Sequence, residues 1–179
     1  MSSNTDSEHH HGWATGNFQA ARRVDLGDCR LVVATPEWAV EDLEAVAASR
    51  QRLKGLFGPH DEWPQADLSV EQNRTDLRWH RDEFEAGTSF AWLIVTPDET
   101  RSIGCLYLYP TQSPNHAAEG FLWTRTDLTA IPSQRIEHRV IRWVEHDCGL
   151  ENVIWPGRSV SHADWTARGF VNYYTEARG

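Results

Sequence analysis

The sequence has few of the features that mark disulfide-stabilised, zinc-binding or membrane-spanning proteins. Cysteine occurs only at Cys29, Cys105 and Cys148, an odd number without a Cys-x-x-Cys spacing, which argues against a disulfide framework or a zinc site. No apolar run approaches the length of a membrane span, and the first residues have no apolar segment typical of a signal peptide. These absences predict a soluble, cytoplasmic protein.

Positive charge is also scarce. The chain has 17 Lys and Arg residues against 26 Asp and Glu residues, which gives a formal net charge of -9. Such a surface has no general attraction for nucleic acid or for an anionic membrane, so neither is expected as a partner. An anionic ligand therefore needs a local cluster of positive side chains.

The length of 179 residues and a hydrophobic content of 40% suit one well-buried core. We expect a polar N-terminal extension over residues 1–28 and one folded domain over residues 29–179. His9, His10 and His11 are adjacent but have no second set of ligands beside them, so no metal site is predicted.

Helix-start signals divide the rest of the chain into segments. Thr35 followed by Pro36 predicts a helix start, and Ser69 with Gln72 forms a capping box. Apolar periodicity then gives the following order: a strand from residue 30, helices over 36–54 and from 69, a hairpin turning at 97–100, a strand over 117–124, a helix from 132, a strand over 152–155, a short helix over 161–168 and a strand over 170–177. The strand, helix, strand order over residues 117–155 predicts a right-handed crossover between two parallel strands.

Both faces of the hairpin strands are apolar. Strict alternation predicts that Ile103 and Cys105 face one way and that Leu106 and Leu108 face the other. Such strands belong in a sheet that is covered on both sides.

This order, together with three short motifs, resembles the GNAT superfamily of acyl-CoA-dependent N-acetyltransferases. The motifs are "RSIGCLYLYP", "AEGFLW" and the W-x-x-x-G-F ending formed by Trp165 to Phe170. More narrowly, the chain looks like a divergent, tryptophan-rich bacterial group that lacks the glycine-rich pyrophosphate loop. The resemblance implies an α/β fold with a mixed, mostly antiparallel sheet, helices on both faces and one parallel β-α-β crossover.

The resemblance also implies where acetyl-CoA binds. The strands around residues 119–124 and 152–155 are expected to splay apart, with the pantetheine arm paired to the backbone of Phe121, Leu122 and Trp123. The pyrophosphate is expected at the start of the helix from Pro132. A primary amine would then attack the thioester directly, without a covalent enzyme intermediate.

The phosphate loop departs from the family pattern. The family usually has Arg/Gln-x-x-Gly-x-Gly/Ala, whereas residues 129–134 read Thr-Ala-Ile-Pro-Ser-Gln. Both glycines are absent and Pro132 has no N–H. The free N–H groups of Ser133, Gln134 and Arg135 at the helix N-terminus remain as phosphate donors.

A basic stripe follows on the same helix. Arg135, His138, Arg139 and Arg142 are spaced i, i+3, i+4 and i+7, so they share one face. One interpretation is a contact surface for the cofactor phosphates, joined by Arg125 from the preceding loop. The other is a solvated face paired with nearby carboxylates, and the sequence leaves both open.

Two residues are the catalytic candidates. Glu119 matches the position of a general base, a role that requires burial to raise its pKa; the alternative is a carboxylate facing solvent. The family often uses a tyrosine to protonate the leaving thiolate, but the matching residue is Trp165, and an indole is no proton source at neutral pH. We expect Tyr173, its neighbour Tyr174 or solvent to take this role.

The sequence therefore predicts an N-acetyltransferase that uses acetyl-CoA and a small amine. The alternative is a non-catalytic GNAT-like protein that binds an acyl-CoA or another small ligand. The strand expected over residues 170–177 would leave an open sheet edge, which makes a homodimer an expectation as well.

Overall fold

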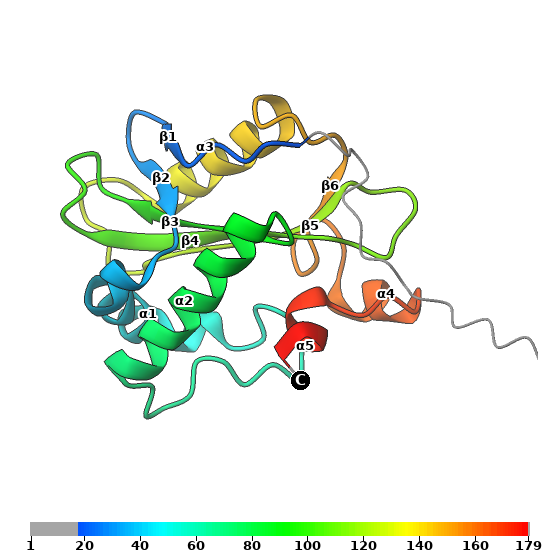
Figure 1. Ribbon diagram of the computed structural model, residues 1–179, viewed down its shortest axis with the longest axis horizontal. Helices are drawn as coiled ribbons and strands as arrows, with labels where there is room; N and C mark the ends of the chain where they lie inside the picture. Colours follow the sequence, from blue (N-terminus) through cyan, green and yellow to red (C-terminus); the bar gives the residue numbers. More distant parts are fainter. Residues whose placement is uncertain (1–17, 179) are drawn as a thin grey trace, which may run out of the picture.

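A six-stranded sheet, with its strands in sequential order from β1 to β6, forms the centre of the molecule (Figure 1). The computed structural model describes residues 18–178. The strands are β1 (Arg23–Asp25), β2 (Arg30–Val33), β3 (Phe90–Val95), β4 (Ser102–Tyr109), β5 (Ala118–Thr124) and β6 (Val153–Ile154). The helices are the 3-10 helix η1 (Pro36–Trp38), α1 (Ala39–Leu53), α2 (Val70–Ala86), α3 (Ser133–His146), α4 (His162–Ala167) and α5 (Tyr173–Arg178).

The pairing of the strands confirms the predicted fold class. β1 to β5 pair antiparallel, and β5 and β6 pair parallel across the crossover helix α3. In Figure 1, α3 lies on one face of the sheet, and α1 and α2 lie on the other, with α4 and α5 on that same side. The sheet is therefore mixed, mostly antiparallel and covered on both faces.

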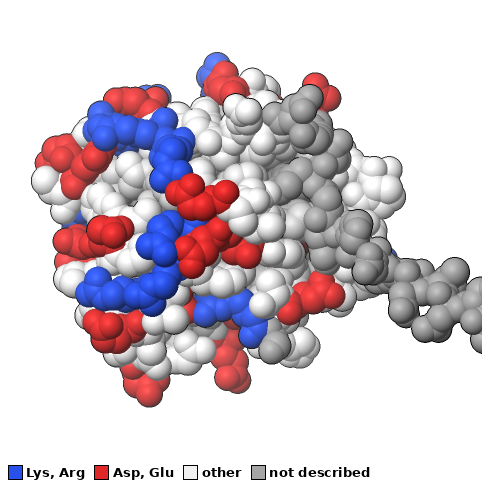
Figure 2. Space-filling view, in the orientation of Figure 1, with Lys and Arg blue, Asp and Glu red and all other residues white. Residues whose placement is uncertain are grey.

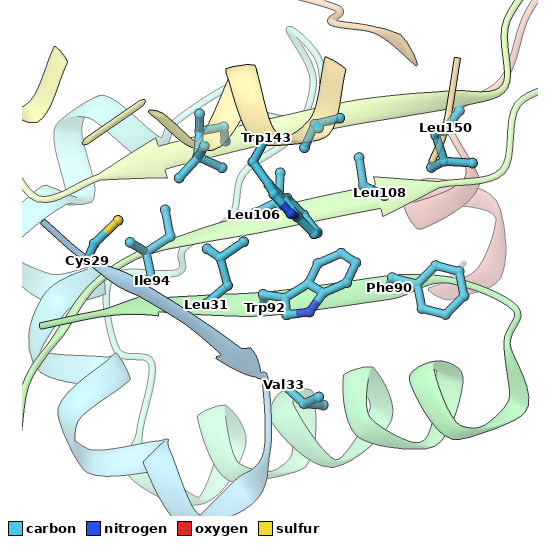
Figure 3. Close-up of a cluster of buried hydrophobic side chains, with 14 of the residues drawn as sticks. Cys29, Leu31, Val33, Phe90, Trp92, Ile94, Leu106, Leu108, Trp143 and Leu150 are labelled. Atoms are coloured by element: carbon cyan, nitrogen blue, oxygen red, sulfur yellow. The ribbon is translucent and has the colours of Figure 1, made fainter. Parts of the chain in front are cut away.

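Two apolar clusters fill the space between these layers. The cluster under α3 includes Trp92, Leu106, Leu108 and Trp143, several of which Figure 3 shows between the sheet and that helix. The second cluster lies under α1 and α2 and is rich in aromatic side chains, including Tyr107. Because side chains alternate along a strand, each central strand contributes to both clusters.

Local capping signals determine where α2 begins and ends. The hydroxyl of Ser69 accepts the N–H of Gln72, and the side chain of Gln72 accepts the N–H of Ser69, so the predicted capping box opens α2. The same helix ends at Gly87, which has a φ of 71°, the left-handed conformation that glycine adopts most easily.

The prediction of a strand over residues 170–177 is wrong. The chain forms helix α5 there, and the side chain of Asn172 accepts the N–H of Tyr174 at 2.8 Å. Asparagine is a favoured N-cap residue, and this signal outweighs the β-propensity of the adjacent tyrosines. The sheet edge from which a homodimer was expected is therefore absent at this position.

The alternation along β4 is interrupted at Ile103. Ile94 pairs with Gly104 and Val95 pairs with Ser102, so Ile103 is left as a bulged residue. It packs in the cluster under α3 instead of facing the same way as Cys105, which corrects the predicted orientation.

The predicted boundary at residue 28 falls inside the β1–β2 hairpin. Val24 pairs with Leu31, and the carbonyl of Ala21 accepts the indole N–H of Trp92 at 2.8 Å. Residues 18–28 thus pack on the domain, and the sequence pattern missed β1 because the strand has one apolar residue. His9, His10 and His11 lie outside the described residues.

On the face seen in Figure 2, positive and negative side chains of the described residues are interspersed, and these residues form no large region of one charge there. Among residues 18–178, no helix has the length and apolar content needed to cross a lipid bilayer.

Candidate functional site

β5 and β6 separate after two residue pairs. Ala118 pairs with Val153 and Glu119 pairs with Ile154, and no pairing between these strands follows. A cavity of about 370 Å³, here called the wedge pocket, opens beyond the last pair. This volume lies within the range of about 300–1,000 Å³ typical of small-molecule sites.

The wedge pocket is lined from three segments. β5 contributes Gly120, Phe121, Leu122 and Trp123; the turn after β6 and the start of α4 contribute Pro156, Gly157, Arg158 and His162; and the end of α1 with the turn after it contributes Arg52, Lys54, Gly55 and Leu56. The predicted contact residues on β5 therefore do line a cavity at the splayed strands.

Glycine is required at two positions of this pocket. Gly157 has a φ of +83°, and a Cβ there would lie 2.6 Å from Nε2 of His162. A Cβ on Gly120 would lie 2.7 Å from the ring of Trp155, which is itself buried. The tryptophan ring thus packs directly on the β5 backbone where the two strands part.

A buried carboxylate outside the pocket lining binds two arginines that line the pocket. Glu137 on α3 is 5% exposed, and its Oε1 accepts from Arg52 at 2.6 Å and from the hydroxyl of Thr124 at 2.8 Å. Its Oε2 accepts from Arg158 at 3.0 Å, and the same Nη2 of Arg158 donates to the carbonyl of Leu122 at 2.9 Å. The guanidinium of Arg158 therefore occupies this backbone carbonyl on the edge of β5.

These side chains make the wedge pocket positive in an acidic protein. Arg52, Lys54 and Arg158 carry three positive charges against the single negative charge of Glu137, a local excess of two. Sequence reasoning missed all three basic residues. Arg52 and Lys54 end a helix, Arg158 follows a proline and a glycine, and no pattern along the chain predicts that they converge.

Glu119 lies at the closed end of the wedge, in the last pair before the strands part. Its side chain is 0% exposed, and Oε1 accepts the hydroxyl of Thr111 at 3.0 Å while Oε2 has no hydrogen-bond partner among the described residues. Burial raises the pKa of Glu119 to about 7, and hydrogen bonding to Thr111 and Trp165 opposes this shift. The alternative of a solvent-facing carboxylate is therefore excluded.

Trp165 is close enough to lower the pKa of Glu119, although its Nε1 makes no hydrogen bond of normal geometry among the described residues. It is 4% exposed, and its ring contacts that of His116 edge-on at 5.5 Å. An indole N–H aimed at this region can bind a carboxylate but cannot supply a proton.

Three of the other predicted contact residues lie outside the lining of the wedge pocket. Arg125 is 3% exposed, and its guanidinium is bound by Asp127 and Glu44. The hydroxyl of Ser133 donates to the carbonyl of Arg125 at 2.7 Å, and Gln134 is exposed. The pocket gives no support for a binding role of these residues.

The basic stripe of α3 faces the β1–β2 hairpin. Nε of Arg135 and Nε of Arg139 approach Oδ2 of Asp28 at 2.8 and 2.6 Å. Neither arginine lines the wedge pocket. For Arg135 and Arg139 ion pairing with a carboxylate is seen, with a partner on a hairpin and not on α3, and a phosphate-binding role of the stripe stays a prediction.

Tyr173 lies on α5, not on a strand. Its hydroxyl donates to Oε2 of Glu83 at 2.6 Å. Burial, the hydrogen bond to Glu83 and the charge of Glu83 raise the pKa of Tyr173 to about 12. The residue holds its proton at neutral pH, and its role as a proton donor stays a prediction.

Cys148 lies two residues after the end of α3 and packs against the apolar cluster under that helix, and burial raises the pKa of its thiol. It is therefore no candidate nucleophile. Within residues 18–178 no three His, Cys, Asp or Glu side chains come close enough together to hold a metal ion.

Solved structures with a similar fold include three acetyltransferases. RimL, a ribosomal L7/L12 α-N-protein acetyltransferase in complex with coenzyme A, is 16% identical over 70% of this chain and 70% of its own, with a TM-score of 0.54. The microcin C7 self-immunity acetyltransferase MccE, in complex with acetyl-CoA and AMP, is 10% identical over 75% and 72%, with a TM-score of 0.56. A ribosomal-protein-S5-alanine acetyltransferase from Vibrio fischeri is 14% identical over 68% and 66%, with a TM-score of 0.53.

These identities are low, and the likeness shows a shared fold. No protein-family model matches the sequence, and no curated protein matches it either.

Proposed function

We propose that this chain, which has the fold of the GNAT acetyltransferases, transfers an acyl group from acyl-CoA to a primary amine by direct attack. The observation that carries the proposal is the environment of Glu119. A buried carboxylate with a pKa of about 7, and with one oxygen that has no hydrogen-bond partner among the described residues, directly precedes the segment of β5 that lines the wedge pocket. A general base works best when its pKa lies near the working pH.

The residues of the wedge pocket suit an acyl-CoA. Its cations, Arg52, Lys54 and Arg158, can neutralise phosphate groups, and the edge of β5 offers a backbone carbonyl to an amide arm. When bound, acyl-CoA supplies an acyl group activated as a thioester.

Arg158 has two roles in this account. It holds the carbonyl of Leu122 as the protein stands, so it must release that carbonyl when a ligand's amide pairs with β5. Arg158 then stays linked to Glu137 and remains available to an anionic group at the mouth of the pocket.

Glu119 provides the base. Its side chain shares the sheet face of Tyr109, its partner across the β4–β5 pair, so it faces the layer of α1 and α2. At pH 7 about half of such carboxyls are ionised and can accept a proton from the attacking amine, directly or through a water molecule. Burial beside Thr111 and Trp165 keeps bulk solvent away from the carboxyl group.

The test combines binding with catalysis. Isothermal titration of the wild type with acetyl-CoA and with free coenzyme A is expected to show binding, and affinity should fall at least tenfold in Arg158→Ala with Arg52→Ala. The absence of heat with either compound would overturn the proposal.

A thiol-release assay over a panel of amines then separates an enzyme from a binding protein. We expect release in the wild type and a loss of about 100-fold or more in Glu119→Gln, which keeps the shape of the side chain and removes the base. Binding without release over the whole panel would favour the non-catalytic alternative, which the indole of Trp165 at the usual acid position also favours.

A further inference from the structure

A second site, separate from the wedge pocket, lies between α2 and α5. Arg178 on α5 forms an ion pair with Asp76 on α2. Its guanidinium also lies over two aromatic rings, 5.3 Å from the ring centre of Trp79 and 5.4 Å from that of Tyr174. One carboxylate and two aromatic faces are the groups from which proteins build sites for cationic ligands.

A small cavity extends inward from this guanidinium. It has a volume of about 20 Å³, which is room for about one water molecule, and its lining includes Asp42, His80 and Arg178. Asp42 is 5% exposed, accepts one hydrogen bond from Asn73 at 3.0 Å and has no ion-pair partner among the described residues. His80 is 7% exposed, and its Nδ1 has no hydrogen-bond partner in the same part of the chain.

These groups are costly to bury as they stand. A buried carboxylate without a cation and a buried ring nitrogen without a partner both lose interactions that water would provide. A ligand that carries hydrogen-bond donors and a positive charge would satisfy Asp42 and His80 together.

Arg178 separates this cavity from an open groove. The groove, of about 540 Å³, lies between residues 57–62 and residues 166–178, and both Tyr174 and Arg178 line it as well as the inner cavity. The side chain of Arg178 is 28% exposed, so part of it already faces solvent. Helix α5 has six residues, none of them buried, and such short helices have little stability of their own.

We propose that Arg178 holds the place of a cationic ligand, and that the site of Asp76, Trp79, Tyr174 and Asp42 binds a guanidinium or primary ammonium group on a flexible, unbranched arm. The ligand enters from the groove and exchanges with Arg178 on Asp76. Its charged end then lies over the two aromatic rings and reaches the inner carboxylate.

This site also bears on the acceptor of the proposed transfer. Tyr109 links the two regions, because its ring centre lies 6.0 Å from that of Tyr174 and it pairs with Glu119 across the sheet. An acceptor with a second positive group would be held by that group here while its amine faces Glu119. This step rests on the proposed function, whereas binding to the site does not.

The test measures binding without any acyl donor. The probe is agmatine, which carries a guanidinium and a primary ammonium group, and the uncharged comparison is N-butylurea. We expect agmatine to bind Arg178→Gln at least tenfold more tightly than the wild type, because the internal competitor is removed and apparent affinity scales with the open fraction. N-butylurea should bind neither protein measurably.

Two further variants sharpen the comparison. Adding Asp76→Asn to Arg178→Gln should abolish agmatine binding, and Arg81→Gln, which removes a guanidinium paired locally with Asp82, should leave the wild-type affinity unchanged. If Arg178→Gln does not fold by circular dichroism, Arg178→Lys replaces it, and at least a threefold gain in affinity is expected because lysine lacks the planar fork.

Three outcomes would each overturn the inference. They are equal agmatine affinity in the wild type and the Arg178 variant, binding of N-butylurea as tight as that of agmatine, and no agmatine binding to either protein. Because no acyl donor is present, such a result leaves the proposed transfer standing. Agmatine binding without thiol release from any amine of the panel would refute the transfer and leave this site standing.

Discussion

Replacing Glu119 by glutamine should change how the stability of the protein depends on pH. The pKa of Glu119 is about 7 in the folded protein, against an ordinary value of 4.5. Between these values the folded state keeps the proton that the unfolded state releases, so the free energy of unfolding of the wild type falls as pH rises through this window. From pH 5 to pH 8 the loss is about 2.5 kcal/mol, and Glu119→Gln does not undergo it.

Thermal unfolding of both proteins at pH 5, 6, 7 and 8 measures the effect. For a chain of this length, about 2.5 kcal/mol corresponds to a shift in melting temperature of roughly 5–10 °C. The melting temperature of Glu119→Gln minus that of the wild type should therefore increase by this amount between pH 5 and pH 8. Asp42 and His80 also titrate abnormally, but they are common to both proteins and cancel in the difference. Replacing the exposed Glu145 by glutamine controls for the change in net charge, and parallel curves for the wild type and Glu119→Gln would refute the reasoning.

Three further variants test the wedge pocket and the alternative phosphate site on α3. Glu137→Ala leaves two arginines without their buried partner and should lower the free energy of unfolding in urea by about 2 kcal/mol. The loss is limited because both arginine side chains stay partly exposed to solvent. An unchanged urea midpoint would contradict a stabilising role of these ion pairs. Gly120→Ala places a Cβ 2.7 Å from the ring of Trp155 and should cost about 1–3 kcal/mol in the same assay, whereas a neutral effect would show that the ring moves freely. Arg135→Ala combined with Arg139→Ala should leave the affinity for coenzyme A within about twofold, and a tenfold loss would move the phosphate site to the stripe on α3.

Elements with strong local signals were predictable from the sequence. The capping box at Ser69 and the strand, helix, strand order around residues 117–155 depend on neighbouring residues and on chain connectivity. The last helix was not predicted, because aromatic residues around Tyr173 favour a strand while the opposing signal is the single cap at Asn172.

The candidate site was predictable only in part. Glu119 and the contact residues on β5 were assigned from the resemblance to the GNAT superfamily, and the structure places them all on β5, where three of them line the wedge pocket. The cations of the wedge pocket were missed because they meet through Glu137, which is 85 residues from Arg52 and 21 from Arg158. Ion pairs between such distant residues depend on packing, and helical spacing alone pointed instead to the stripe that binds Asp28.

The pH dependence of kcat/KM for thiol release from acetyl-CoA tests the central claim most directly, with an amine found active in the panel. If Glu119 is the base, the rate should rise with pH along a curve whose midpoint lies near 7, and this rise should be absent in the residual activity of Glu119→Gln. A wild-type profile without a midpoint near 7, or the same profile in Glu119→Gln, would contradict the assignment of this buried carboxylate as the base.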